Sequence, residues 1–503
     1  MFALACFIGI YSYGVFALGI SCILTKINIL AFSFSWFLIL IIYLFKYNLE
    51  STISNFKLNK YSWLLLSLLI TQLLVNLVGA LGPELGFDAL WYHLTQPKIW
   101  LQEGLIRFIP GPVFRYSVTP QLTETLYAAA LAFSNEIWAK IIHFSFGILS
   151  LVITYKISKK LLPDAYCLFP PLILSSNLVF SWLQTTAYID LTRTFFESLA
   201  LFLFLEEKYT PCAITLGLAV CTKLVSIVSL PIFIFLLILN KSFLKTGLQF
   251  TAYSLLIPLP WFLFAFIQTG NPFYPVGSLD LAMPLSWNPA DLWTLFSRSA
   301  DPVSPIYIIT VPLIFFSGFK KWGRGEQIIT AYVLIAIFFW FLFPHTGGSR
   351  YFLPYLPALS VLIIVIFLNL KDHLIKKSLI FLTLTLTLTS IVYRAVANLR
   401  YLPVILGYQT RSDFLAKNLN FSFGDFYDTD NYLSRHLSPA ASIYPIGINN
   451  LYYINYRIIT PQGDSPIADY LLLRRPDSGY LPDAKWQPVH YNPLTKTTLY
   501  GLK

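Results

Sequence analysis

Residues 62–80 form an uncharged apolar run, Ser62-Trp-Leu-Leu-Leu-Ser-Leu-Leu-Ile-Thr-Gln-Leu-Leu-Val-Asn-Leu-Val-Gly-Ala80. The 19 residues of this run match the ~20 that an α-helix needs to cross a bilayer. The chain changes character directly afterwards, because Gly82-Pro-Glu-Leu-Gly-Phe-Asp-Ala-Leu-Trp-Tyr-His93 brings two carboxylates and several aromatic rings. We therefore expect a membrane helix that ends in a polar, acidic segment.

The composition of the whole chain points to a membrane protein. Of the 503 residues, 12% are charged and 56% are hydrophobic, whereas an ordinary soluble chain has about 25% charged residues. The net charge of +11 comes from 35 Lys and Arg against 24 Asp and Glu. These basic residues gather in short loops between apolar runs, which is the positive-inside pattern of membrane proteins. Nucleic acid is therefore not an expected partner.

Apolar runs of helical length recur along residues 1–397, which we predict to be an all-α polytopic membrane domain. We expect about thirteen transmembrane helices, although several runs are shorter than the ~20 residues of an upright span. The runs at 211–222 and 225–239 form either one bent helix or a re-entrant pair. The predicted spans are 3–24, 28–45, 62–80, 137–155, 166–182, 191–205, 211–222, 225–239, 248–267, 305–319, 327–343, 352–370 and 378–396.

The basic residues fix the expected orientation. With the N-terminus in the cytoplasm, every inner loop is basic, and one helix more or fewer would place the later Lys clusters outside. Residues 81–136, 268–304 and the tail from 398 to 503 then lie outside, where we expect the chemistry. The inner-loop residues are Lys46, Lys57, Lys60, Lys156, Lys159, Lys160, Lys208, Lys241, Lys245, Lys320, Lys321, Arg324, Lys371, Lys376 and Lys377.

The outer segments have their own predicted structure. In the first outer loop, residues 81–136, we expect interfacial helices. The tail has helix-like character from Asp413 and alternating strand-like segments at 441–446 and 451–459, punctuated by Pro and Gly. We therefore predict a small α/β extracytoplasmic domain over residues 398–503.

Two carboxylates fall at helix starts on the outer side. Asp88 precedes Trp91 and Tyr92 by one helical turn, so a short helix can present the carboxylate beside aromatic rings. Asp190 stands where the run at 191–205 begins. Both are candidates for chemistry, and both equally fit a helix N-cap. Glu197 lies inside a predicted span, where a carboxylate is costly unless paired, and Arg193 is the expected partner.

Two cations on the outer side are not explained by orientation. Lys223 lies at the break between two short apolar runs, and Arg350 lies at the start of the last span but one. A cation at a helix N-terminus opposes the helix dipole, so Arg350 is expected to bind an anion such as a phosphate. Snorkelling toward the interface is the alternative for both. His93 and His345 lack metal-ligand spacing and are candidates for hydrogen bonding rather than metal binding.

Several motifs together resemble the GT-C class of integral-membrane glycosyltransferases, which includes bacterial aminoarabinose transferases and protein O-mannosyltransferases. The resemblance extends over residues 60–400 and places the motifs in the order and on the side of the membrane that the class requires. The motifs are Phe87-Asp-Ala-Leu-Trp-Tyr-His with Lys98 and Gly104, Tyr188-Ile-Asp-Leu before Phe195-Phe196, Thr222-Lys223, Thr269-Gly-Asn-Pro-Phe-Tyr-Pro, and Ser349-Arg-Tyr-Phe-Leu-Pro.

The resemblance implies the GT-C fold, a bacterial cytoplasmic membrane, and a sugar donor carried on a polyprenyl phosphate. Asp88 takes the place of the general base, and Asp190 matches the second acidic position, which supports the acceptor or a metal. Lys223 and Arg350 match basic positions near the donor phosphate. Residues expected to support this site are Glu84, Tyr92, His93, Lys98 and His345.

One departure from the class concerns a metal. Relatives often carry two adjacent acids in the first loop, but Ala89 follows Asp88 here. Either Glu84 supplies the second carboxylate or one carboxylate suffices, so a divalent metal on Asp88 and Asp190 is an open possibility. The acceptor, whether lipid, glycan or protein, is not indicated by any single residue.

Two other functions compete with sugar transfer. A transporter or lipid flippase would use the outer-face charges as gates, but such proteins place ionisable residues near mid-membrane and show paired repeats. A scaffold that only presents the tail would leave the outer charges unexplained. An inverting glycosyltransferase is the function that the sequence favours.

Overall fold

The computed structural model describes residues 1–46, 60–110, 114–239, 243–277, 303–317, 322–342, 349–419, 427–459, 468–474 and 482–502. Lys57, Lys241, Lys320 and Lys321, predicted for inner loops, lie outside these residues, and so does the predicted site residue His345.

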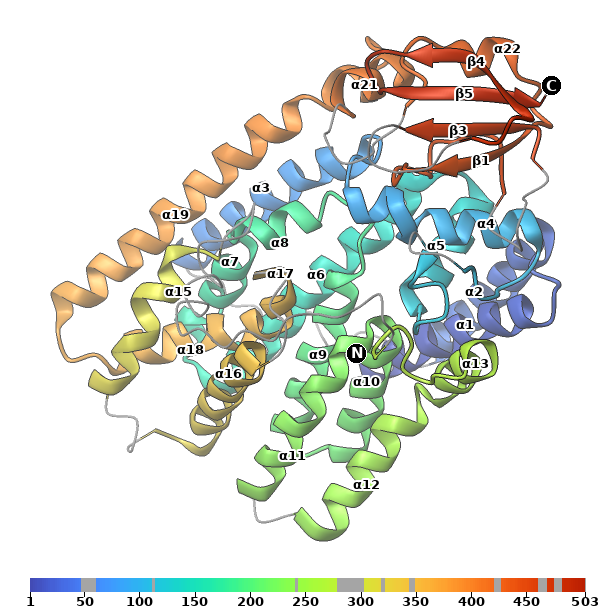
Figure 1. The fold of residues 1–503 in the computed structure, drawn as a ribbon. Coiled ribbons are helices and arrows are strands. Elements are labelled where there is room, and N and C mark those ends of the chain that lie inside the picture. The colour runs from blue at the N-terminus through green and yellow to red at the C-terminus, as the bar shows by residue number, and fades with distance from the viewer. Residues whose placement is uncertain are drawn as a thin grey trace.

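A helical bundle makes up most of the molecule (Figure 1), and each of the thirteen predicted runs contains at least one helix. The bundle helices are α1 (Phe2–Ile20), α2 (Lys26–Lys46), α3 (Lys60–Leu81), α6 (Glu136–Leu161), α7 (Phe169–Ser175), α8 (Leu178–Leu183), α9 (Asp190–Leu205), α10 (Tyr209–Thr222), α11 (Ser229–Leu239), α12 (Phe243–Leu256), α13 (Leu259–Thr269), α15 (Pro305–Thr310), α16 (Arg324–Leu342), α17 (Ser349–Phe352), α18 (Leu356–Asn369) and α19 (His373–Leu399).

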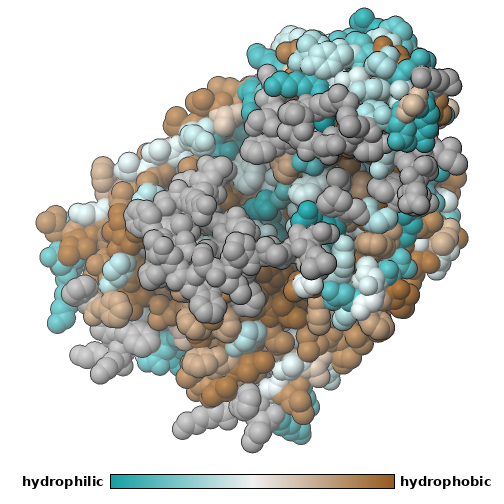
Figure 2. Space-filling model, in the orientation of Figure 1, coloured by the Kyte–Doolittle hydropathy of each residue, from teal (hydrophilic) through white to brown (hydrophobic). Residues whose placement is uncertain are grey.

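The bundle has the surface expected of a membrane protein. Hydrophobic side chains cover the helical part in Figure 2, while hydrophilic ones gather over the sheet at the opposite end. Six described helices are long and apolar enough to cross a bilayer alone, or seven if the bent pair α12 and α13 is one span. The expectation of several apolar membrane helices is therefore confirmed, and the count of about thirteen stays a prediction.

Several predicted spans are broken rather than straight. The run at 166–182 divides into α7 and α8, because the Asn177 side chain caps α8 by accepting from the Val179 N–H (3.1 Å). Helices α12 and α13 meet at an angle of 52°, and Pro258 precedes α13. Between α10 and α11 the chain is extended at Lys223, with φ −152° and ψ 120°.

Short helices over residues 89–133 lie on one end of the bundle, as predicted for the first loop. A π-helix, η2 (Ala89–His93), leads into α4 (Thr95–Glu103), and α5 (Leu122–Phe133) follows. Gly104 ends α4 in the left-handed conformation (φ 76°), where glycine avoids strain. Helix α5 packs against α1, α2, α4 and α6, which anchors this loop to the bundle.

The tail forms a small α/β unit beside this loop (Figure 1). Its sheet has the order β2-β1-β3-β5-β4, with β1 parallel to β2 and β3, and β5 antiparallel to β3 and β4. The predicted strand at 441–446 is β1, whereas only two residues of 451–459 are strand. The elements are α20 (Leu402–Ile405), α21 (Arg411–Asn418), α22 (Tyr432–His436), β1 (Ser442–Ile446), β2 (Arg457–Ile458), β3 (Tyr470–Arg474), β4 (Trp486–Asn492) and β5 (Thr497–Leu502).

The tail and the first loop share a core. Ile99 and Ile109 of the loop are buried in one apolar cluster with Ile443 of β1. The backbone N–H groups of Leu451 and Tyr452 both approach the carbonyl oxygen of Leu90 at 3.1 Å. The first loop and the tail therefore lie on the same end of the bundle, as the predicted topology requires.

Candidate active site

Four charged side chains from four separate segments meet at this end of the bundle. Asp88 precedes η2, Asp190 begins α9, Lys223 follows α10, and Arg350 lies in α17. Arg350 Nη1 lies 2.7 Å from Asp88 Oδ2, and Arg350 Nε lies 3.8 Å from Asp190 Oδ2. Lys223 Nζ lies 2.7 Å from Asp190 Oδ1. The result is an alternating chain of two carboxylates and two cations, which we call the charged cluster.

The capping interpretation of the two carboxylates is wrong. Asp88 precedes η2 but makes no side-chain capping bond, and the N-cap of α9 is Ile189 rather than Asp190. Both carboxylates instead face cations. Lys223 in turn stands at the C-terminus of α10, where the helix dipole favours a positive charge.

The charged cluster is partly open. The side chains of Asp88, Lys223 and Arg350 are 13%, 15% and 19% exposed, whereas Asp190 is 2% exposed. Asp190 Oδ2 is buried and makes no hydrogen bond to any described residue. A ligand can therefore reach Asp88 and both cations, while Asp190 lies behind them.

Aromatic rings line the charged cluster. The Tyr188 hydroxyl accepts from the Asp88 backbone N–H (3.1 Å), and the Arg350 guanidinium lies 5.1 Å from the centre of the Tyr188 ring. Lys223 Nζ lies 4.6 Å from the Tyr351 ring centre. Both distances suit cation–π attraction. Burial, together with the Asp88 carboxylate, raises the pKa of Tyr92 well above its usual value, so its hydroxyl stays a proton donor.

Buried groups on α5 and α6 hold the segment that carries Asp190. The Tyr127 hydroxyl donates to the Tyr188 carbonyl, and His143 Nε2 accepts from the Leu191 N–H (3.0 Å). The sequence analysis did not select Tyr127 or His143. Only His143 had a signal in the sequence, because it lies in the predicted span 137–155, where a polar side chain needs a specific partner.

The predicted pair of Arg193 and Glu197 is confirmed, and it lies directly behind the charged cluster. Arg193 Nε is 2.6 Å from Glu197 Oε1, with both side chains at most 2% exposed. Glu197 Oε2 accepts from the Ser229 hydroxyl. Arg193 Nη1 also donates to the carbonyl oxygen of Tyr351 (3.2 Å). The pair therefore fixes the backbone next to Arg350.

The structure places two predicted supporting residues in buried contacts beside the site. Glu84 Oε1 accepts from the Leu85 N–H (2.9 Å) and the Gly86 N–H, and its Oε2 accepts from the Ala187 N–H. Burial raises the pKa of Glu84. His93 Nδ1 lies 2.7 Å from Glu124 Oε1 within the protein. Glu84 thus ties the backbone before Asp88 to the backbone before Tyr188.

Lys98 faces the tail rather than the charged cluster. Its ammonium donates to the carbonyl oxygens of Tyr452 (2.8 Å) and Ile454. Lys98 therefore joins α4 to the tail.

Cations, rather than a metal site, occupy the carboxylates of the charged cluster. No described residues form a group of three His, Cys, Asp or Glu side chains able to hold one. Mg²⁺ and Ca²⁺ require several oxygen ligands, but Asp88 and Asp190 each face a cation. A metal on these two carboxylates would have to displace both Arg350 and Lys223.

Known structures resemble this arrangement of elements, although comparison of the sequence finds no matching family model and no matching curated protein. ArnT, the aminoarabinose transferase from Cupriavidus metallidurans, superposes in its apo state with a TM-score of 0.55 at 13% identity, over 87% of this chain and 97% of that one. Its complex with undecaprenyl phosphate gives 0.54 at 14%, over 88% and 98%. The chain has the GT-C fold.

A third similar structure is the oligosaccharyltransferase of Archaeoglobus fulgidus, tethered to an acceptor peptide. It gives a TM-score of 0.49 at 13% identity, over 79% of this chain and 64% of that one. ArnT and this oligosaccharyltransferase are both GT-C glycosyltransferases. The superposition on ArnT, which covers 87% of this chain, confirms the fold predicted from the motifs.

Proposed function

We propose that this protein is an integral-membrane glycosyltransferase that moves a sugar from a polyprenyl-phosphate donor to an acceptor hydroxyl. The observation that carries the proposal is the charged cluster, in which a reachable carboxylate, Asp88, lies beside two reachable cations, Lys223 and Arg350. Transfer from a phosphate leaving group needs one base and stabilisation of the developing phosphate charge. The similar ArnT structure with undecaprenyl phosphate supports this donor class.

The proposed reaction is a single displacement with inversion. Asp88 takes the proton of the acceptor hydroxyl while the acceptor oxygen bonds to the anomeric carbon of the sugar. The bond from that carbon to the phosphate oxygen breaks, and the polyprenyl phosphate leaves with the electron pair. Lys223 and Arg350 stabilise the negative charge that grows on this phosphate.

Donor binding prepares Asp88 for its role. Arg350 Nη1 pairs with Asp88 Oδ2 at 2.7 Å. A phosphate that binds Arg350 competes with that pairing and frees Asp88 to accept a proton. Asp190 stays behind both cations and keeps them in place, because it is buried and contacts each of them.

The topology completes the proposal. About thirteen spans, an N-terminus in the cytoplasm, a membrane domain over 1–397 and an extracytoplasmic domain over 398–503 place the charged cluster at the outer surface of a bacterial cytoplasmic membrane. The shared core of the first loop and the tail supports this arrangement, because both must then lie on one side.

Sugar release from a labelled donor tests the function. The full chain in nanodiscs is incubated with polyprenyl-phosphate sugars that carry radiolabelled sugar, and donor consumption is followed with and without a cell-envelope extract as acceptor source. A protein that only moves lipid leaves the sugar on its carrier.

A matched pair of variants tests the base. Asp88→Asn should lower transfer about 10²- to 10⁴-fold, the usual contribution of a general base, with donor binding retained. Asp483→Asn removes the same charge at a site in the tail that is 65% exposed and should leave transfer unchanged. Full activity of Asp88→Asn would refute the assignment of Asp88.

A further inference from the structure

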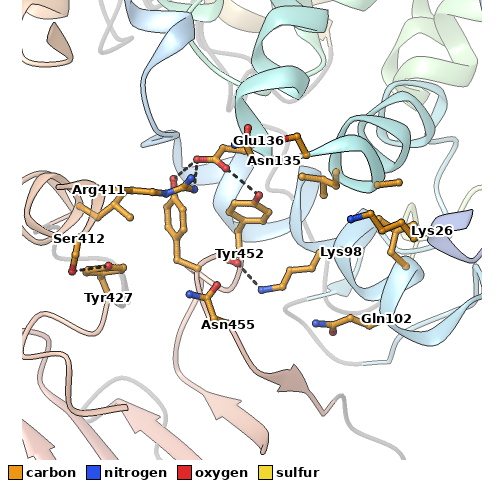
Figure 3. A pocket seen from close by; sticks show the side chains of 16 residues that line it. Lys26, Lys98, Gln102, Asn135, Glu136, Arg411, Ser412, Tyr427, Tyr452 and Asn455 are labelled. Atoms are coloured by element: carbon orange, nitrogen blue, oxygen red, sulfur yellow. Dashed lines mark hydrogen bonds and ion pairs between the residues drawn. The ribbon is translucent and has the colours of Figure 1, made fainter. Parts of the chain in front are cut away.

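A second polar site lies between the first loop and the tail. A cavity of about 590 Å³ opens among α4, the start of α6, α21 and the chain before β2, and Figure 3 shows side chains from both parts pointing into it. This volume falls within the ~300–1,000 Å³ usual for ligand sites, which often lie at domain interfaces. We call it the interdomain cavity.

The interdomain cavity carries an excess of positive charge. Lys26, Lys98 and Arg411 line it against one carboxylate, Glu136. Arg411 pairs with Glu136, and Lys98 binds backbone carbonyls. The ammonium of Lys26 makes no ion pair or hydrogen bond with any described residue (Figure 3). The cavity thus presents an unused cation in a positive surrounding, which favours an anionic ligand.

The topology does not explain Lys26. It begins α2, so it lies between the first two spans, on the side where the positive-inside rule disfavours basic residues in short loops. Lys26 also begins α2, which we predict to span the membrane, so we place the cavity beside the predicted membrane surface. A ligand anchored in or near the membrane can therefore reach it.

The remaining lining suits a sugar. Tyr452 and Tyr453 pack with ring centres 5.1 Å apart, and their hydroxyls lie 3.2 and 3.3 Å from the Glu136 carboxylate. The amides of Gln102 and Asn455 also line the cavity and have no hydrogen-bond partner among the described residues (Figure 3). Aromatic side chains beside amides without a partner among the described residues match the apolar surface and the hydroxyl groups of a sugar.

One wall of the interdomain cavity reaches the segment of Asp88. The Tyr453 hydroxyl donates to the Glu84 carbonyl oxygen (2.8 Å). The Glu84 carboxylate in turn accepts from the Gly86 N–H, two residues before Asp88. Tyr453 thus links the interdomain cavity to the segment that positions the proposed base.

We propose that the interdomain cavity binds the acceptor through a sugar that carries a phosphate or carboxylate. The inference rests on the proposed function in taking this ligand as the acceptor. The anionic group binds at Lys26, the sugar ring packs on the tyrosines, and Gln102 and Asn455 bind its hydroxyls.

Binding of simple probes tests the cavity without catalysis. Glucose 6-phosphate, glucuronate and glucose are added to the full chain in phosphatidylcholine nanodiscs, and binding is measured by saturation-transfer NMR. Both anionic probes should bind, and glucose should bind at least tenfold more weakly. Equal binding of glucose and glucose 6-phosphate would refute an anionic site.

A matched pair of lysine variants locates the binding. Lys26→Gln should weaken glucose 6-phosphate binding about tenfold, as expected for loss of one charge-assisted contact. Lys485→Gln removes the same charge from a tail residue that is 42% exposed and should have no effect. Unchanged binding to Lys26→Gln, or an equal loss in both variants, would overturn the proposal.

Two further measurements distinguish probe binding in the interdomain cavity from binding elsewhere. Nanodiscs that contain phosphatidylglycerol should not abolish glucose 6-phosphate binding, and complete loss there would assign the cavity to a bulk lipid headgroup. Arg350→Ala should bind glucose 6-phosphate as the wild type does. If the wild type turns over the donor but does not bind the anionic probes, this inference alone is refuted. If the wild type binds the probes but turns over no donor, the proposed function alone is refuted.

Discussion

Helix α9 carries charges in two settings that differ in access. Asp190, its first residue, belongs to the charged cluster, whose partners come from separate segments and are 13% to 19% exposed. One turn later, Arg193 and Glu197 pair within the helix at 2.6 Å and are at most 2% exposed. In the charged cluster and in the Arg193–Glu197 pair alike, the positive and negative side chains neutralise one another. Only the first can exchange a partner for a ligand, because only the first is reachable and its partners lie on different segments.

The buried pair of Arg193 and Glu197 should contribute more to the free energy of unfolding than the charged cluster does. Glu197→Ala leaves the Arg193 guanidinium buried without its carboxylate, which typically costs about 3–5 kcal/mol. Asp88→Asn, in the open cluster, should cost at most about 1 kcal/mol, as for other partly exposed pairs. Thermal unfolding in detergent measures both. Glu197→Gln keeps an acceptor for the Ser229 hydroxyl and should fall between them. A larger loss for Asp88→Asn than for Glu197→Ala would invert the comparison.

The charged cluster, in turn, should contribute more to ligand binding than the buried pair does. Arg350→Ala should weaken polyprenyl-phosphate binding about 100-fold, the effect of losing a charged bidentate contact. Arg350→Lys keeps the charge but loses the guanidinium fork, so its loss should be smaller. Mass spectrometry of the lipid that copurifies with each variant gives the readout. Retention of polyprenyl phosphate by Arg350→Ala would remove Arg350 from the donor site.

Much of the charged cluster could be predicted from the sequence, because the predicted topology does not account for its two cations. The predicted topology places Arg350 and Lys223 on the side where the positive-inside rule disfavours cations, and in the structure both lie beside Asp190. The sequence left capping and chemistry equally open for Asp88 and Asp190, since both interpretations place Asp at a helix start. Only the packing of α17 against this end of the bundle decides between them.

The remaining parts of the site depend on contacts distant in sequence. Lys98 and Tyr452 are 354 residues apart, and their contact joins the first loop to the tail. No local pattern encodes that distance, so the sequence could not predict that Lys98 binds carbonyl oxygens of the tail. Lys26 escaped attention for the same reason, since it contributes to a cavity whose other wall begins near residue 411. The apolar runs, by contrast, are local, and each of the thirteen contains at least one described helix.

Within the charged cluster, Lys223 should contribute less to donor binding than Arg350 does. Of the two carboxylates in the charged cluster, Lys223 pairs with Asp190 alone, at 2.7 Å, whereas Arg350 contacts both. Lys223→Gln should therefore raise the KM for donor about tenfold, consistent with one lost charge-assisted hydrogen bond. Lys208→Gln, at a residue 59% exposed and away from the cluster, serves as the control. An effect of Lys223→Gln equal to that of Arg350→Ala would show that the two cations act as one unit.

Lys98 is intermediate between the two settings, since it lies largely within the protein but binds carbonyl oxygens instead of a carboxylate. Burial lowers the pKa of Lys98 from 10.5 to about 8. Between about pH 8 and pH 10.5 the unfolded chain therefore binds more protons at Lys98 than the folded chain does, and folding becomes more favourable as pH rises through that window. The gain is at most about 1.4 kcal/mol per pH unit.

The difference between wild type and Lys98→Gln isolates this group, because other titrations cancel in the subtraction. Between pH 7.5 and pH 9.5, the unfolding temperature of the wild type should rise relative to that of Lys98→Gln. A flat difference for Lys98→Gln would mean that Lys98 keeps its proton above pH 8, and that two carbonyl oxygens stabilise a buried cation as well as a carboxylate does.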